Sequence, residues 1–136
     1  MTDPLTRGVH HVGLAVRDLD EAVSFFCGAL GFKEVGRNDT YPALFVSDGS
    51  VTLTLWRLTD PANAVAFNRK TNIGLHHLAL AVPDEAALAV VYERVRDHRG
   101  VTVEFAPEPM RPGSATHHFI CAMPGGVRIE FATRPS

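Results

Sequence analysis

The sequence predicts an α+β fold in which two βαβββ modules pair into a concave, partly closed mixed β-sheet with helices on the outside. A repeated segment and the matching order of predicted elements after each copy lead to this prediction. Residues 10–18 (HHVGLAVRD) and residues 76–84 (HHLALAVPD) are identical at six of nine positions. Repetition at one fixed offset indicates a duplicated structural unit.

A helix is predicted directly after each copy of the repeat, with an aspartate before it and a glycine after it. Aspartate side chains cap helix N-termini, and glycine readily adopts the left-handed conformation that ends many helices. The first predicted helix covers residues 21–29, between Asp18 or Asp20 and Gly31, and the second covers residues 85–98, between Asp84 and Gly100.

Three strand-like runs follow each predicted helix. Asp48-Gly49 and Gly125-Gly126 stand where hairpin turns are expected. The predicted strands cover residues 32–37, 41–47 and 50–57 in the first half and residues 101–105, 116–123 and 127–133 in the second. The chain is therefore expected to form a single domain over residues 1–136, with modules at 9–57 and 75–133. The linker, residues 58–74, is expected to be a loop with one helical turn.

Composition restricts the partners to be expected. The net charge of −2 gives no reason to expect binding to nucleic acid. No apolar run approaches the roughly 20 residues of a membrane span, and the N-terminal residues lack the apolar stretch of a signal peptide. Two cysteines among 136 residues are too few for a disulfide framework. A cytoplasmic protein without a membrane or nucleic-acid partner is expected.

Alternation along the repeated strands separates their two faces. Side chains of a strand point alternately to opposite sides of the sheet. The bulky apolar residues of each repeat share one face, which should pack on the helix. His11 and His77 share the other face with small residues: Gly13 and Ala15 in the first repeat, Ala79 and Ala81 in the second. Small neighbours leave room for a ligand beside each histidine.

The last strand of each half follows the same alternation. Glu130 stands between Ile129 and Phe131, and Thr54 holds the matching place in the first half. The open face is therefore expected to collect His11, His77 and Glu130, with Thr54 in a fourth related position. Two imidazoles and one carboxylate suit Fe(II), Mn(II), Ni(II), Co(II) or Zn(II), with coordination positions left open for a substrate. The alternative is that each is a polar surface side chain without a metal.

At these residues the chain resembles the vicinal oxygen chelate superfamily, which includes glyoxalase I, extradiol dioxygenases, fosfomycin-resistance proteins and bleomycin-resistance proteins. The resemblance covers residues 9–133 and rests on four motifs: His11-x₆-Asp18, FF-x₃-LGF over residues 25–32, His77-x₆-Asp84 and PGGVRIE over residues 124–130. It implies paired βαβββ modules around one divalent metal held by His11, His77 and Glu130. It also implies a small-molecule substrate and a homodimer.

The chain departs from individual members of that superfamily. Thr54 stands where glyoxalase I has an acidic fourth ligand. Ile120 falls where extradiol dioxygenases and fosfomycin-resistance proteins have a tyrosine, so Ile120 is a candidate substrate contact. Bleomycin-resistance proteins generally lack the metal ligands, which are present here.

Two further residues are candidates for the site. His118 should face the same side as Ile120, where it is a candidate general acid or base, although a surface histidine is an equal alternative. Arg111, in the loop over residues 108–113, is a candidate clamp for an anionic substrate, although such arginines are more often solvated.

These observations favour a metal-dependent enzyme acting on a small oxygen-rich organic substrate. Glu130 and His118 are its candidate catalytic residues, and Thr54, Arg111 and Ile120 are its candidate substrate-binding residues. A lyase or isomerase reaction is narrowly preferred. The alternatives are an extradiol-type dioxygenase, a fosfomycin-resistance-like transferase, a metal-independent drug-binding protein and a dimer with a vestigial site.

Overall fold

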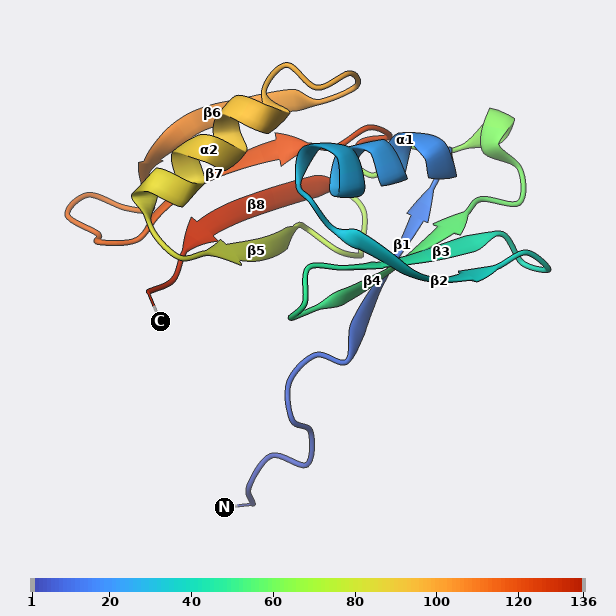
Figure 1. The fold of residues 1–136 in the computed structure, drawn as a ribbon, viewed down its shortest axis with the longest axis horizontal. Helices are drawn as coiled ribbons and strands as arrows, with labels where there is room; N and C mark the ends of the chain where they lie inside the picture. The colour runs from blue at the N-terminus through green and yellow to red at the C-terminus, as the bar shows by residue number, and fades with distance from the viewer. Residues whose placement is uncertain (1, 136) are drawn as a thin grey trace.

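The computed structural model describes residues 2–135, and it contains two βαβββ units in succession (Figure 1). The first unit consists of β1 (His11–Val16), α1 (Leu19–Val23), η1 (Ser24–Ala29), β2 (Lys33–Asn38), β3 (Ala43–Ser47) and β4 (Thr52–Arg57). The second consists of β5 (Leu78–Val82), α2 (Glu85–Val95), β6 (Thr102–Pro109), β7 (His117–Ala122) and β8 (Arg128–Thr133). One 3₁₀ turn, η2 (Pro61–Asn63), lies in the linker, where a helical turn was expected.

Each unit forms its own four-stranded mixed sheet, and the two sheets have the same topology. The strand orders are β1-β4-β3-β2 and β5-β8-β7-β6. In both, the first strand pairs in parallel with the last, and the remaining pairs are antiparallel. The predicted α+β fold of two βαβββ modules is confirmed. Within one chain the two sheets are separate, and β1 and β5 are edge strands.

The two helical segments begin at the predicted caps. The Asp18 carboxylate accepts a hydrogen bond from Glu21 N at 3.1 Å, and Asp84 accepts one from Ala87 N at 2.8 Å. The first segment was expected to be one regular helix, but its second half is π-helical, with Leu30 N bonded to Phe25 O at 3.2 Å.

Alternation of apolar residues does not distinguish a π turn from an α turn, because both can place Phe25 and the adjacent Phe26 in the core. The second helix ends at Val95, short of the predicted end, and a turn follows before Gly100 at φ 86°.

Each helical segment covers one face of its sheet, and the two segments lie next to each other (Figure 1). Apolar side chains of both units form one core cluster between sheets and helices. His98 joins the units: its ring centroid lies 6.0 Å from that of Phe25, and its Nε2 lies 3.4 Å from Ser24 Oγ. The predicted domain and linker boundaries stay predictions.

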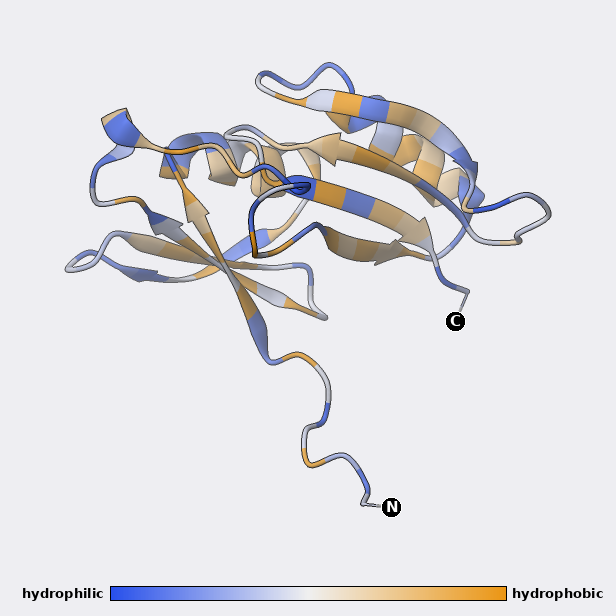
Figure 2. Cartoon of the chain, turned by 180° about the vertical axis from the view of Figure 1, so that it is seen from behind, coloured by the Kyte–Doolittle hydropathy of each residue, from blue (hydrophilic) through white to orange (hydrophobic). Residues whose placement is uncertain are grey.

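The uncovered sheet faces lie on the side away from the helices. Figure 2 shows this side, with hydrophilic residues interspersed among apolar ones along the strands. The N-terminal arm extends from the start of β1 away from the body (Figure 1). Within residues 2–135, neither helix has the length and apolar character that crossing a membrane requires.

Candidate active site

The face of each strand agrees with the predicted alternation. In β1, Leu14 and Val16 are buried under the helix, whereas His11 is exposed with Gly13 and Ala15. The matching strand β5 has the same pattern, with Leu80 and Val82 buried and Ala79 and Ala81 exposed. The uncovered faces therefore carry the small residues that sequence alternation assigned to them.

Glu130 lies in the middle of the uncovered face of the second sheet. It pairs in register with Ala79 of β5 and Ile120 of β7, and only 8% of its surface is exposed. Its Oε1 lies 3.4 Å from His77 Nε2, and its Oε2 accepts a hydrogen bond from His118 Nδ1 at 2.6 Å. Three of the predicted site residues, His77, His118 and Glu130, thus form a cluster.

His118 is held from two sides. Its side chain is 12% exposed, and the ring of Phe105 lies 5.0 Å from it, centroid to centroid. When Nδ1 donates its hydrogen to Glu130, Nε2 is the nitrogen that remains able to accept a proton. The arrangement is that of an imidazole oriented by a carboxylate.

Thr54 occupies the matching place in the first sheet. It pairs with Gly13 as Glu130 pairs with Ala79, and it is likewise 8% exposed. Its Oγ1 accepts a hydrogen bond from Trp56 Nε1 at 2.9 Å and donates one to Val12 O at 3.4 Å. The hydroxyl group is thus satisfied within its own sheet.

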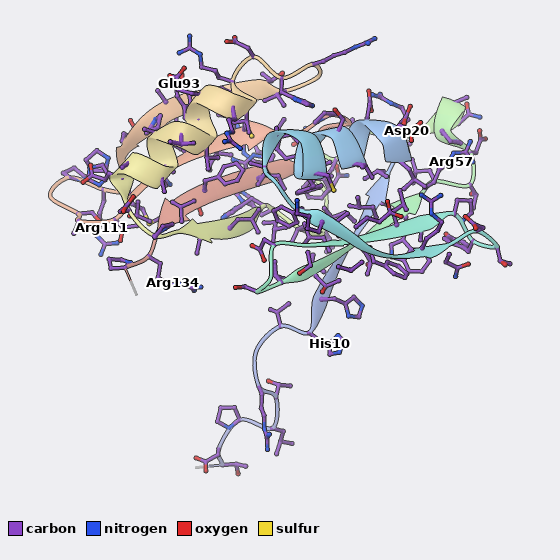
Figure 3. All side chains as sticks on the ribbon, viewed as in Figure 1. His10, Asp20, Arg57, Glu93, Arg111 and Arg134 are labelled. Carbon is purple, nitrogen blue, oxygen red and sulfur yellow. The ribbon has the colours of Figure 1, made fainter. Side chains whose placement is uncertain are left out.

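His11 is not brought to this cluster within one chain. It is exposed, and its Nδ1 lies 2.8 Å from Nδ1 of His10, which Figure 3 shows where the N-terminal arm meets β1. Residues 2–135 of a single chain contain no group of three or more His, Cys, Asp or Glu side chains arranged to hold a metal ion. The predicted three-ligand set therefore stays a prediction.

The two remaining candidates differ in their relation to the cluster. Ile120 is 8% exposed and lies directly beside Glu130 in the register of β7 and β8. Arg111 is exposed in the loop between β6 and β7, at the periphery of the second unit (Figure 3). Substrate binding by either residue stays a prediction.

A partly exposed ion pair beside His77 was not predicted. Arg128 donates to both carboxylate oxygens of Glu104, at 2.7 and 2.9 Å, and its Nη1 donates to His76 O at 3.0 Å. The Arg128 side chain is 11% exposed, and Arg69 Nη1 lies 3.8 Å from Glu104 Oε1. Arg128 thereby fixes the backbone directly before His77.

The sequence carried a partial signal for this pair. Arg128 has the same parity as Glu130, so alternation places it on the uncovered face. Its partner could not be identified, because the register between β6 and β7 shifts between Val103 and Phe105, on either side of Glu104.

The ion pair is expected to make stability depend on acid pH. The hydrogen bond from Arg128, with the charges of Arg69 and His76, holds the pKa of Glu104 below its ordinary value of 4.5. A carboxylate with a depressed pKa stabilises the fold above its unfolded-state pKa, and this contribution disappears as pH falls through the folded-state value. In urea titrations from pH 7 to pH 3, Glu104→Gln should lower the unfolding midpoint at pH 7 and reduce its decline below pH 4.5.

The exposed Glu93→Gln substitution is the control for the loss of one carboxylate. Its unfolding midpoint should follow that of the wild type throughout. Equal stability of Glu104→Gln and wild type at pH 7 would contradict the stabilising role of the Arg128 pair.

One hollow between the two units does not coincide with the cluster. It has a volume of about 210 Å³ and is lined by residues of both units, including Val12, Val51 and Leu78. His77, His118 and Glu130 do not line it. In one chain, the cluster therefore lies on an open face.

Comparison with known proteins gives two curated relatives. A 2-epi-5-epi-valiolone epimerase from Actinomyces sp. is 30% identical over 149 residues, covering 94% of this chain and 80% of the epimerase. A catechol-2,3-dioxygenase from Bacillus subtilis is 29% identical over 91 residues, covering 65% of this chain but only 31% of the dioxygenase.

Solved structures share the fold along nearly the whole chain. A glyoxylase/bleomycin resistance protein/dioxygenase domain from Frankia sp. has a TM-score of 0.79 at 26% identity, covering 94% of this chain and 92% of that one. A lactoylglutathione lyase from Agrobacterium tumefaciens has a TM-score of 0.70 at 18% identity, covering 96% of both chains. The latter likeness concerns the fold alone.

The family comparison agrees with the resemblance seen in the sequence motifs. The model of the Glyoxalase/Bleomycin resistance protein/Dioxygenase superfamily matches residues 8–131, which include both repeats and both uncovered sheet faces. The chain belongs to the glyoxalase/bleomycin resistance protein/dioxygenase superfamily.

Proposed function

We propose that this protein is a metal-dependent enzyme of isomerase or lyase type acting on a small oxygen-rich organic substrate. The observation that carries the proposal is the cluster of His77, His118 and Glu130 on the uncovered face of the second sheet. Its carboxylate lies 3.4 Å from one imidazole and is hydrogen-bonded to the other at 2.6 Å. Imidazoles and a carboxylate on a partly exposed surface are typical of a catalytic centre.

The complete site is proposed to form between two copies of the chain. Within residues 2–135, both sheets leave one face uncovered, and β1 and β5 each have an outer edge without a strand partner. Unpaired strand edges favour association with another chain. If β1 of one copy lies beside β5 of the other, His11 of the first approaches His77 and Glu130 of the second.

The donor atoms fit a divalent metal ion. Two neutral imidazoles and one carboxylate form a common set for first-row divalent ions and leave positions for a substrate. Two of these three ligands, His77 and Glu130, are already adjacent. His11, His77 and Glu130 would hold the ion, which when bound would polarise a substrate oxygen as a Lewis acid.

His118 is proposed to move the proton of the reaction. Its Nδ1–H is directed to Glu130 Oε2, so Nε2 can take a proton from a substrate carbon and return it. Phe105 packs against the ring and limits water access from one side. Isomerisation or epimerisation beside a carbonyl needs such a proton transfer.

The isomerase type is preferred on the extent of similarity. The epimerase matches 94% of this chain and 80% of its own length, whereas the chain spans only 31% of the catechol dioxygenase. The dioxygenase remains a second candidate because two histidines and one carboxylate also form the ligand set of non-haem Fe(II) oxygenases.

Mixing two inactive variants tests whether the site is shared. His11→Ala and His77→Ala homodimers should both fail to retain metal. In a heterodimer of the two variants, one site lacks both histidines and the other is intact. After unfolding and refolding together, metal content should return to about a quarter of the wild-type level, since half the dimers are mixed.

A site formed within one chain would show no recovery on mixing. His117→Ala mixed with His77→Ala serves as the control, because His117 contacts Glu85 of the helix rather than the cluster. Metal-free wild-type protein that binds drugs normally would instead support the drug-binding alternative.

The reaction type is tested on protein loaded anaerobically with Fe(II), Mn(II), Co(II), Ni(II) or Zn(II). We expect solvent deuterium to enter a cyclic polyhydroxyketone or the hemithioacetal of methylglyoxal, and His118→Ala to slow this exchange roughly 100-fold or more. Dioxygen consumption with catechol and Fe(II) would favour the second candidate. Glutathione transfer to fosfomycin would favour the transferase alternative.

A further inference from the structure

Three aromatic side chains gather on the uncovered face of the first sheet. The ring centroid of Trp56 lies 5.1 Å from that of Tyr41 and 6.2 Å from that of Phe45. Phe45 pairs with Thr54, and Trp56 is two residues from Thr54 on the same strand. Phe45, Thr54 and Trp56 therefore point to the same side of the sheet. Phe45 and Trp56 are partly exposed, and Tyr41 is 47% exposed.

The arrangement of these rings depends on missing side chains nearby. A Cβ atom at Gly36 would lie 2.7 Å from Phe45 Cδ2, so the Phe45 ring occupies the space of a side chain there. A Cβ atom at Gly13 would lie 3.2 Å from Thr54 Oγ1, the atom that accepts the Trp56 hydrogen bond. The Trp56 indole nitrogen already donates to Thr54 Oγ1 at 2.9 Å. The polar edge of the indole is thus satisfied, and its orientation is fixed.

The second sheet has no such group at the matching places. Trp56 pairs with Ala15 of β1, and the position that pairs with Ala81 of β5 is Ala132. Phe45, the neighbour of Thr54, corresponds to Ile120, the neighbour of Glu130. The uncovered face of the second sheet therefore carries Glu130 with His77 and His118, whereas that of the first carries the Tyr41, Phe45 and Trp56 rings.

We propose that Trp56, Tyr41 and Phe45 form a binding wall for a flat ring in the substrate. The inference rests on the proposed function, since it requires the two uncovered faces to meet across one site. Thr54 lies beside Phe45 and Trp56, in the place of the first sheet that matches Glu130 in the second. In a site shared as proposed, a ring held by the wall would lie next to the reacting groups. Aromatic side chains favour offset or edge contacts with another ring and bury a large apolar area. Of the substrates proposed above, the wall therefore favours the cyclic one over the linear hemithioacetal.

Trp56 is the sole tryptophan of the chain, so its fluorescence reports on the wall directly. Zn(II)-loaded protein is titrated with catechol and with propane-1,2-diol, which offers the same pair of oxygens without a ring. Catechol should quench the emission at saturation, and propane-1,2-diol at equal concentration should not.

Affinity is then measured by calorimetry in variants. Trp56→Ala should weaken catechol binding roughly 10-fold. Trp56→Phe, which keeps a ring, should stay within about threefold of the wild type, and Tyr41→Ala should be intermediate. Val90→Ala, on the exposed side of α2, is the matched control and should bind normally.

Each outcome decides the inference. Unchanged catechol affinity in Trp56→Ala at full zinc content would overturn the wall while leaving the metal site intact. Dissociation of Trp56→Ala into monomers, measured by sedimentation, would assign the rings to packing between copies and also overturn the wall. Absence of zinc from wild-type protein would overturn the proposed function, and ring-dependent quenching in that metal-free protein would still support the wall.

Discussion

Replacing Glu130 with glutamine is expected to remove bound metal almost completely. The substitution keeps the size of the side chain but removes the negative charge that a divalent ion requires at a site with two neutral imidazoles. Metal content measured by mass spectrometry should fall from about one ion per chain to less than a tenth of that. Proton exchange into the substrate should fall with it.

Because Glu130 is buried, its replacement can also destabilise the fold, and unfolding would remove the metal by itself. Glu93→Gln, on α2 with a side chain 66% exposed, is the control for removing an acidic group. Circular dichroism should show that Glu130→Gln retains its secondary structure. Full metal content in this folded variant would contradict the role of Glu130 as a ligand.

Replacing Phe119 with alanine is expected to lower the free energy of unfolding by a large amount. Phe119 is fully buried, its ring stacks on that of Phe131 at 5.1 Å between centroids, and Tyr92 meets it edge-on at 5.2 Å. The cavity left in the core should cost about 3–5 kcal/mol of unfolding free energy. Denaturant titration of the metal-free protein avoids a contribution from ligand binding.

Val90→Ala provides the matched comparison for this prediction. It also shortens an apolar side chain, but Val90 is 53% exposed, so its unfolding free energy should change by no more than about 0.5 kcal/mol. A loss below about 1 kcal/mol for Phe119→Ala would show that the core around Phe131 relaxes to fill the space.

Much of the fold could be predicted because the sequence pattern of the structural unit occurs twice in the chain. Alternation in β1 and β5 assigned Leu14 and Leu80 to the helix side and His11 and His77 to the uncovered side, and the structure agrees. Asp84 was identified as a cap because its hydrogen bond is local in sequence. Features that depend on residues close together in the sequence could therefore be predicted.

Features that depend on how one strand pairs with another could not be predicted from the sequence. The contact between His118 and Glu130 follows from pairing of β7 with β8, and the partner of Arg128 depends on a bulge in β6. The hydrogen bond from Trp56 to Thr54 joins side chains two positions apart on one strand, but alternation alone does not give their rotamers. Whether His11 meets His77 depends on how two copies of the chain associate, which the structure of a single chain does not show.

The difference between Thr54 and Glu130 has a consequence for stereochemistry. A site assembled from two equivalent halves would accept a small molecule in two orientations related by the internal pseudo-symmetry. Here one half offers a carboxylate and the other a hydroxyl group that is already bonded to an indole. Only one orientation then brings a given carbon to His118, so catalysis at this site would act on a single enantiotopic face and give products of one handedness.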